Sequence, residues 1–340
     1  MRIGFNPNKD KKRKTNDFFH QVIIPVYIPN QESYFKDSID LLKFCLNSLI
    51  LTSHSKTYFT VVANGCCIEV KNYLNELLNE NKIHEIVHTT AIGKLNAVLK
   101  GIVGHDFPLI TISDADVLFL NHWQSETYIV FNEFPKAGAV STTPNSKMVK
   151  HYTSSIFVDT LFSKQVQFSA VENPIAMQSF AESIGNPTFF KKVHLEKYAT
   201  VTSQNNRKAV IGAGHFVATY RGEIFNSLKN KYSNYSLGGD SEIVFLDKTV
   251  QENSLWRLST INNFTYHLGN TKEDWMQVVF DAIQNETHVE VKAPRIFSIK
   301  SNKFLYWFKV NFSGKILFKK PIWRLFLQYK GLSKSEAKDY

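Results

Sequence analysis

The chain has 340 residues, of which 43% are hydrophobic and 21% are charged, and these values are typical of a globular protein. No uninterrupted run of 18 apolar residues occurs, which excludes an obvious membrane-spanning helix. Three cysteines, Cys45, Cys66 and Cys67, form no CxxC pair, so the sequence does not indicate a disulfide framework and fits a reducing compartment.

The formal net charge of +10 is concentrated at the two ends. Residues 1–14 contain six basic residues and one acidic residue, and residues 295–340 contain eleven and two, so residues 15–294 carry a net charge of −4. We interpret residues 1–20 as a basic N-terminal segment without the apolar core of a signal peptide. Because the body is mildly acidic, we expect no nucleic-acid partner.

Strand and helix patterns alternate through the first part of the chain. Buried strands are predicted at 21–27, 58–63, 83–88 and 108–113, and helical spacing of apolar residues is found at 33–54, 68–80 and 93–103. This alternation predicts an α/β fold with a mostly parallel central sheet and helices on both faces. Ligands of such sheets bind at the carboxyl ends of the strands.

The pattern becomes less regular after about residue 140. Ser, Thr, Asn and Gln are frequent through 141–210, which predicts loops and short strands, and residues 271–290 have helical spacing. We therefore divide the chain into the segment 1–20, a ligand-binding half at 21–140, a second half at 141–270 that shapes the other side of the site, and a basic, aromatic helical region at 271–340.

Two carboxylates follow the strand at 108–113, in the sequence Ser113-Asp114-Ala115-Asp116. Side chains alternate along a strand, so Asp114 and Asp116 lie on the same side, where repulsion and desolvation disfavour them unless a positive charge compensates. Carboxylate oxygens suit Mg²⁺ or Mn²⁺, which complete their coordination with phosphate oxygens. The alternative is a pair of solvated turn residues.

Four short motifs occur in an order that resembles the nucleotide-sugar half of a family 2 glycosyltransferase, over residues 21–125. They are QVIIPVY at 21–27, VVANG at 61–65, IGKLNAVLKG at 92–101 and SDAD at 113–116. The resemblance implies a GT-A fold, which is Rossmann-like, with 21–140 as the nucleotide-sugar-binding half and 141–270 as the acceptor-binding half that carries the catalytic base. The family usually has Val-Asp-Asp-Gly-Ser at the second strand end, so Ala63 replaces an acid here and leaves the nucleotide base undefined.

The resemblance also implies roles for individual residues. Asp114 and Asp116 match the metal-binding pair, and Lys94 matches a lysine near the base and the diphosphate. A fixed cation of this kind can act as a point charge on a phosphate, whereas the alternative is an exposed lysine at a helix start. The implied nucleotide-sugar-binding residues are Pro25, Val26, Tyr27, Asn64, Gly93, Lys94, Asp114, Ala115 and Asp116.

A catalytic carboxylate is expected in Leu237-Gly-Gly-Asp-Ser-Glu-Ile243. Inverting sugar transfer needs a base that takes the proton of an acceptor hydroxyl, and the glycines let the backbone approach a ligand. Asp240 falls where the family has its catalytic Asp, and Glu242 is the second candidate. The alternative is a helix start, since acidic residues favour that position.

A late histidine, His267 in Tyr266-His-Leu-Gly-Asn270, matches by order a histidine that completes the metal shell in many GT-A enzymes. A neutral imidazole can bind manganese. The alternative for a single histidine is a structural or surface role. The nearby sequence IGAGHFV at 211–217 lacks the third glycine of a dinucleotide fingerprint, so we do not interpret it as one.

Aromatic and basic residues alternate in the C-terminal region. Nine of the 27 residues in 303–329 are Phe, Tyr or Trp, compared with 14% in the whole chain, and Lys and Arg recur between them. This composition favours the boundary between water and an anionic membrane. The alternative is a helical hairpin that packs on the body or on a second copy of the chain, so a homo-oligomer is also open.

Together these features predict a metal-dependent, inverting glycosyltransferase with Mn²⁺ or Mg²⁺ as cofactor. The expected donor is a nucleotide-diphospho-sugar, with a UDP-sugar as the first candidate, and the expected acceptor is a hydroxyl of a glycan or lipid-linked molecule in cell-surface polysaccharide synthesis. The expected location is the cytoplasm, peripheral at the cytoplasmic face of the membrane. The alternatives are a nucleotidyltransferase on a similar fold and a non-catalytic, membrane-associated protein.

Overall fold

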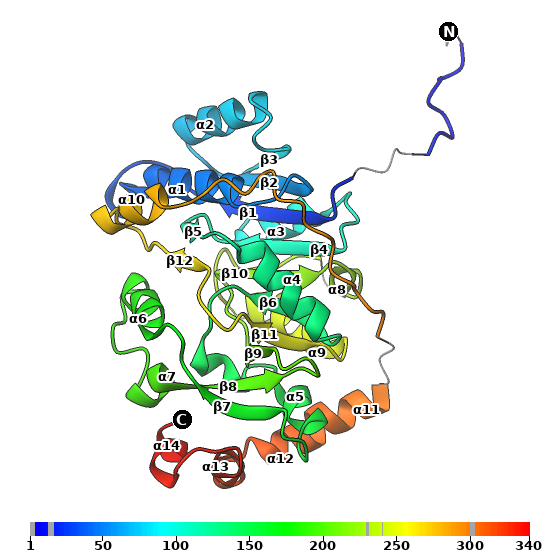
Figure 1. Cartoon of the computed structure of the whole chain (residues 1–340). Coiled ribbons are helices and arrows are strands. Elements are labelled where there is room, and N and C mark those ends of the chain that lie inside the picture. Colours follow the sequence, from blue (N-terminus) through cyan, green and yellow to red (C-terminus); the bar gives the residue numbers. More distant parts are fainter. Residues whose placement is uncertain (1–3, 13–16, 229–230, 240, 300–302) are drawn as a thin grey trace.

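A computed structural model describes residues 4–12, 17–228, 231–239, 241–299 and 303–340. A ten-stranded mixed sheet runs through the molecule in the order β3-β2-β1-β4-β10-β6-β11-β9-β8-β7 (Figure 1). Its strands are β1 His20–Val26, β2 Thr57–Asn64, β3 Glu85–Thr89, β4 Leu109–Ser113, β6 Ala137–Ser141, β7 Val166–Ala170, β8 Lys197–Thr202, β9 Lys208–Ile211, β10 Val217–Arg221 and β11 Trp256–Ser259.

The first four strands pair in parallel, as the sequence predicts. Strand β10 then pairs antiparallel with both β4 and β6, β11 is parallel to β6, and β9, β8 and β7 continue antiparallel. The second half of the chain thus extends the same sheet. A second sheet has two antiparallel strands, β5 Val117–Phe119 and β12 Thr265–His267.

Helices cover both faces of the parallel part because its strands are apolar on both sides. Val22 and Ile24 of β1 pack with α1 and α2, whereas the intervening Ile23 packs with α3. Figure 1 shows this layering, and the predicted α/β class with helices on both faces of the parallel strands is confirmed, whereas the GT-A type stays a prediction. The helices of the first half are η1 Ser33–Phe35, α1 Ser38–Leu51, α2 Ile68–Asn79, α3 Lys94–Ile102 and α4 Trp123–Glu133.

The second half contains shorter helices between its strands. The predicted helix over 271–290 is restricted to α10, and the residues after it up to 299 are not helical. These helices are η2 Ser146–Lys150, α5 Ser154–Asp159, α6 Pro174–Ser183, α7 Lys192–Glu196, α8 Glu223–Asn226, the π-helical turn η3 Ile243–Asp247, α9 Lys248–Glu252 and α10 Asp274–Asp281.

The C-terminal helices gather at one end of the molecule, remote from α2 (Figure 1). They pack through Trp323, Phe326 and Leu327 into the same core as strands β6, β8 and β9. Among the described residues, no helix is both long and apolar enough to cross a bilayer. The helices are α11 Lys303–Trp307, the π-helical segment η4 Phe308–Gly314, α12 Lys315–Leu317, α13 Lys320–Tyr329 and α14 Lys334–Asp339.

A buried polar network lies beneath the start of β1. His20 and His54 both contact the hydroxyl of Tyr128, and Nε2 of His20 lies 2.7 Å from Oγ1 of Thr111. Burial lowers the pKa of His54 from its usual 6.5 to about 4, with the charge of Lys56 acting in the same direction, and burial lowers the pKa of His20 well below its usual value. Both imidazoles are therefore neutral at pH 7.

Acid should destabilise the fold through these histidines. As the pH falls below 6.5, the unfolded chain takes up protons that the folded His54 binds only near pH 4, so stability falls through that window. We expect His54 alone to lower the free energy of unfolding by about 2 kcal/mol between pH 7 and pH 5. Urea unfolding at both pH values measures it. His54→Gln should reduce the difference by that amount, whereas His88→Gln, at an exposed position, should leave it unchanged.

Candidate active site

A cavity of about 760 Å³ opens at the edge of the sheet where β1, β2 and β4 end. This is the edge at which ligands of parallel sheets bind. Nine residues predicted from the sequence line this one cavity: Pro25, Tyr27, Asn64, Gly93, Lys94, Asp114, Ala115, Asp116 and His267. The residues that the four motifs carry are thus brought together by the parallel strand ends.

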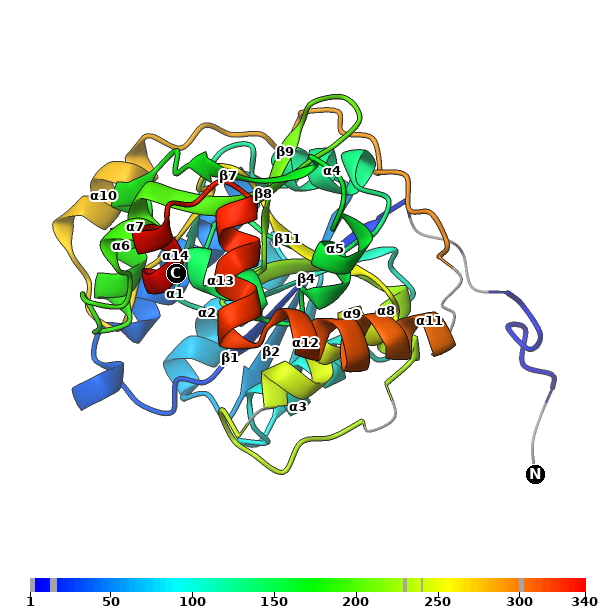
Figure 2. The same cartoon turned by 90° about the horizontal axis from the view of Figure 1, so that it is seen from below.

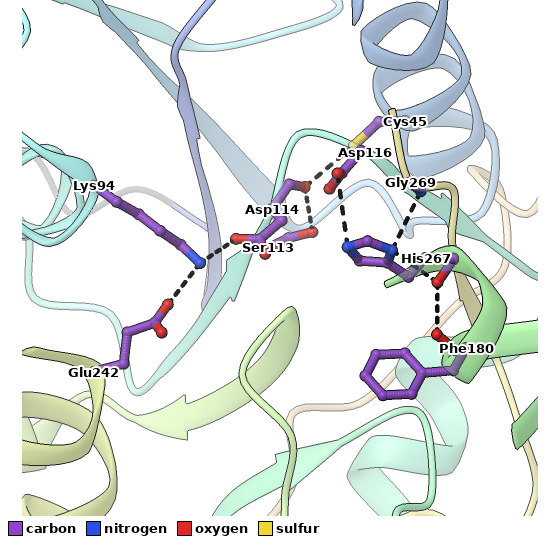
Figure 3. Close-up of polar contacts among 10 residues, drawn as sticks. Cys45, Lys94, Ser113, Asp114, Asp116, Phe180, Glu242, His267 and Gly269 are labelled. Atoms are coloured by element: carbon purple, nitrogen blue, oxygen red, sulfur yellow. Dashed lines mark hydrogen bonds and ion pairs between the residues drawn. The ribbon is translucent and has the colours of Figure 1, made fainter. Parts of the chain in front are cut away.

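Lys94 forms two short ion pairs in this cavity. Its Nζ lies 2.6 Å from Oδ1 of Asp114 and 2.6 Å from Oε1 of Glu242 (Figure 3). Burial would lower the pKa of Lys94, but the two carboxylates outweigh it and raise that pKa. Lys94 is thus a permanently charged group that compensates one of the paired aspartates and links α3 to the helix that Glu242 begins.

Asp116 faces His267 instead of a lysine. The antiparallel pairing of β5 and β12 sets His267 opposite Val117, the residue after Asp116, and leaves 3.7 Å between Nε2 of His267 and Oδ2 of Asp116. Burial raises the pKa of Asp116 and the charge of Asp114 raises it further, while His267 opposes the shift. Ligand atoms of Asp114, Asp116 and His267 all lie within 4.8 Å of one another.

The second nitrogen of His267 has partners for either tautomer. Nδ1 lies 3.0 Å from Oγ of Ser183, whose hydroxyl donates to the Phe180 carbonyl, and the N–H of Gly269 donates to Nδ1 over 3.2 Å (Figure 3). A proton on Nδ1 shared with Ser183 would replace the hydrogen bond from Gly269 and leave the Nε2 lone pair facing Asp116. That tautomer suits a metal ligand, because a second-shell acceptor on Nδ1 orients the imidazole.

The segment before Glu242 lies directly over the start of α3. Gly93 has a φ of 93°, and a Cβ there would lie 2.7 Å from the Tyr235 carbonyl, so only glycine allows this approach. The N–H of Lys94 donates to the Ser236 carbonyl, and Asn96 exchanges hydrogen bonds with the backbone of Ser233. Residues 233–239 are thereby held beside the cavity.

Three predicted site residues have other placements. The side chain of Val26 is fully buried in the core between β1 and α1, since strand alternation turns it away from Pro25 and Tyr27. Glu242 does not line the main cavity and reaches it through Lys94. Asp240, the predicted base, lies outside the described residues.

The sequence reasoning missed part of the cavity wall. Two aromatic residues of η1, Tyr34 and Phe35, line it near Tyr27, whose ring contacts Phe35 edge-on at 5.8 Å. Aromatic residues directly after the first strand end could have been noticed as a signal. Ser183, Ile184 and Gly185 also line the cavity from the end of α6, and no sequence pattern distinguishes them.

A second cluster of polar residues centres on Asp247, which is fully buried. Its Oδ2 lies 2.6 Å from Nε2 of His215 and 3.2 Å from Nε2 of His151, and its Oδ1 lies 2.6 Å from the buried guanidinium of Arg257. Arg257 also donates to the carbonyls of His151 and Ala213. Chiefly the charge of Arg257 overcomes the burial and lowers the pKa of Asp247 to about 2.

This cluster acts as a hydrogen-bonded anchor. Ligand atoms of His151, His215 and Asp247 lie within 4.8 Å of one another, but the guanidinium of Arg257, 2.6 Å from Asp247, already compensates the carboxylate. Arg257 ties together the segments that carry His151 and His215, and Asp247 ends the π-helical turn that follows Glu242. The anchor therefore fixes the helix beside the cavity.

Removing the charge of Asp247 should destabilise the fold. Asp247→Asn keeps the shape but leaves the guanidinium of Arg257 buried without a counter-charge, and breaking a buried pair in this way typically costs about 3–5 kcal/mol. The free energy of unfolding in urea at pH 7 measures the loss. Asp106→Asn, at an exposed position, is the control, and a loss no larger than that of the control would contradict the anchor.

Comparisons with known proteins give only a distant likeness. No protein-family model matches the chain, and no curated protein matches it. The mannosyltransferase PcManGT from Pyrobaculum calidifontis, solved with GDP-Man and Mn²⁺, is 15% identical with a TM-score of 0.41; the match covers 75% of this chain and 59% of that one. S. aureus TarS 1–349 is 11% identical with a TM-score of 0.42, covering 92% and 81%.

A second structure of S. aureus TarS 1–349, in complex with UDP-GlcNAc, is 11% identical with a TM-score of 0.41, and the match covers 94% of this chain and 69% of that one. The match to the mannosyltransferase covers 59% of that protein, which is less than two thirds of its length. At these TM-scores the likeness assigns no activity, and the function has to be argued from the cavity and its side chains.

Proposed function

We propose that the protein is a metal-dependent, inverting glycosyltransferase. It would move a sugar from a nucleotide-diphospho-sugar, with a UDP-sugar as the first candidate, to a hydroxyl of a glycan or lipid-linked acceptor in cell-surface polysaccharide synthesis. One observation carries the proposal: Asp114, Asp116 and His267 converge within 4.8 Å in a cavity large enough for such a donor, at the carboxyl edge of the sheet.

The donor set fits a divalent cation. Two carboxylates and one imidazole suit Mn²⁺ or Mg²⁺, and the only ion-pair partner of Asp116 among the described residues is the imidazole of His267, 3.7 Å away. Asp114, Asp116 and His267 would hold the ion. When bound, such an ion neutralises charge that develops on a leaving diphosphate.

Lys94 would add a fixed cation on the opposite side of Asp114. A pre-positioned charge stabilises negative charge that develops in the transition state without further reorganisation. The paired carboxylates keep this lysine protonated, since they raise its pKa. Lys94 therefore supports the same leaving group as the metal.

The base would be Asp240, as the resemblance implies. Glu242 already pairs with Lys94, which makes its carboxylate a weaker proton acceptor, whereas Asp240 belongs to the same short segment after the cavity-lining Leu237. In the reaction the acceptor oxygen loses its proton to this carboxylate and attacks the anomeric carbon. The bond from that carbon to the diphosphate oxygen breaks, and the nucleoside diphosphate leaves with the electron pair.

Metal-dependent donor binding tests the proposal. Titration calorimetry with Mn²⁺ and a panel of UDP-, GDP- and CDP-sugars should show one donor that binds only with the metal and is slowly hydrolysed. Asp116→Asn should weaken that binding at least about tenfold, because one charged ligand is lost. Asp106→Asn should bind as the parent does. No response to any donor, or turnover of nucleoside triphosphates alone, would refute the proposal.

The base assignment has a separate test. Asp240→Asn should keep metal-dependent donor binding and lower donor turnover by at least about 100-fold, the usual contribution of a positioned base. Glu242→Gln is the matched comparison, and we expect it to weaken donor binding by releasing Lys94. An active Asp240→Asn variant beside an inactive Glu242→Gln variant that still binds donor would move the role to Glu242.

A further inference from the structure

The tail, residues 303–340, is an integral part of the domain. Trp323 packs edge-on against Phe157 at 5.2 Å, and Phe326 does so at 5.5 Å. Nζ of Lys330 donates to the carbonyls of Thr160, Leu161 and Ser163. The inner face of the tail is therefore buried and holds the tail in one orientation.

The outer face of the same helices is also apolar. In the continuous helical segment 303–317, Phe308, Phe312 and Ile316 recur every fourth residue, and the rings of Phe308 and Phe312 stack at 5.4 Å. Helix α13 repeats the arrangement. The exposed apolar residues are Phe304, Trp307, Phe308, Phe312, Ile316, Ile322, Leu325 and Tyr329, with 37–75% of each residue accessible.

The helices that carry the two exposed rows adjoin at one end of the molecule. Figure 2 shows that α11 and α12 form one line and that α13 turns away from its end. A helix that is apolar on two opposite faces is normally buried on both. Exposed apolar surface of this extent on a soluble domain indicates an interaction site.

The positive charge around these rows indicates what kind of partner fits them. No acidic residue occurs between Glu290 and Glu336. Lys315, Lys319 and Lys320 are exposed at the turn that joins the two rows, and no carboxylate in the described part of the chain forms an ion pair with them. A partner for this face must accept apolar side chains and carry negative charge.

We propose that this face docks on a bilayer surface rich in anionic lipid, so that the protein is peripheral at an anionic leaflet such as the cytoplasmic face. The aromatic and aliphatic side chains would enter the boundary of the acyl chains, and the three lysines would lie among the headgroups. Two copies of this basic face repel each other, and nucleic acid offers no apolar surface of this kind, so an anionic membrane matches both properties.

Vesicle sedimentation tests the inference and needs no sugar nucleotide, so its result is independent of the proposed activity. The full chain should bind vesicles of equal parts phosphatidylcholine and phosphatidylglycerol in 0.1 M salt. It should not bind phosphatidylcholine alone, and binding should weaken in 1 M salt, where the Debye length falls from about 10 Å to about 3 Å.

Two sets of variants separate the contributions. The triple variant Lys315→Gln, Lys319→Gln, Lys320→Gln should weaken vesicle binding about 100-fold, and the double variant Phe312→Ser, Leu325→Ser by at least about tenfold. One control variant removes three exposed lysine charges elsewhere, and the other removes two exposed apolar side chains elsewhere. Both should bind vesicles as the full chain does. They are Lys36→Gln, Lys56→Gln, Lys100→Gln and, separately, Ile175→Ser, Val278→Ser.

Three results would overturn the inference. The first is that the full chain does not bind the anionic vesicles. The second is that the tail variants bind them as tightly as the full chain does. The third is that the double variant binds vesicles as before but has a lower molar mass than the full chain in light scattering. The second would assign binding to another basic region, and the third would make the face an interface between copies of the chain. Unchanged urea unfolding of each variant confirms that the fold is retained.

Discussion

The compensation of buried and partly buried carboxylates beside the cavity is the constraint on which the site depends. Asp114, Glu242 and Asp247 each meet a cation from another segment, namely Lys94 for the first two and Arg257 for the third. A buried carboxylate without such a partner is strongly disfavoured. These ion pairs therefore fix α3, the loop 211–216 and the helix after Glu242 relative to β4.

Asp116 is the exception among these carboxylates. Its nearest cationic candidate is an imidazole 3.7 Å away, and burial raises its pKa. The negative charge of Asp116 is therefore only partly compensated, and a divalent cation would compensate it. The packing of the strand ends is linked in this way to the proposed chemistry. Lys94, 2.6 Å from Asp114, compensates one of the two aspartates.

The tail combines a face that packs on the body with an exposed apolar face. Its aromatic residues divide between two faces: Trp323 and Phe326 belong to the core, whereas Leu325 and Tyr329 are exposed. Composition cannot make this division, because the helix direction and the position of the body decide which side is covered. Deleting the tail would expose core surface, and point substitutions on the outer face are therefore the appropriate probe.

Sequence patterns predicted the first half of the fold well because its signals are local. Parallel strands buried on both faces are continuous apolar runs, and the amphipathic helices between them have a clear period, so 58–63 and 68–80 were close to the observed β2 and α2. Past residue 140 the strands are short and partly polar. Strand β10 connects them to β4, and this pairing joins residues that are distant in the sequence. The helix expected over 271–290 is restricted to Asp274–Asp281, where Met276 packs in one cluster with Leu41 and Phe44 of α1.

The sequence by itself determined which residues could carry the chemistry: the paired aspartates at a strand end, a glycine and lysine at a helix start, and a late histidine. These rest on strand alternation, backbone freedom and side-chain chemistry, all of which are local properties. Only the tertiary structure decided that Lys94 pairs with Asp114 and Glu242, that His267 stands beside Asp116, and that Val26 turns into the core. Such partners depend on strand register and helix packing, which bring distant segments together and leave no mark in any single stretch of sequence.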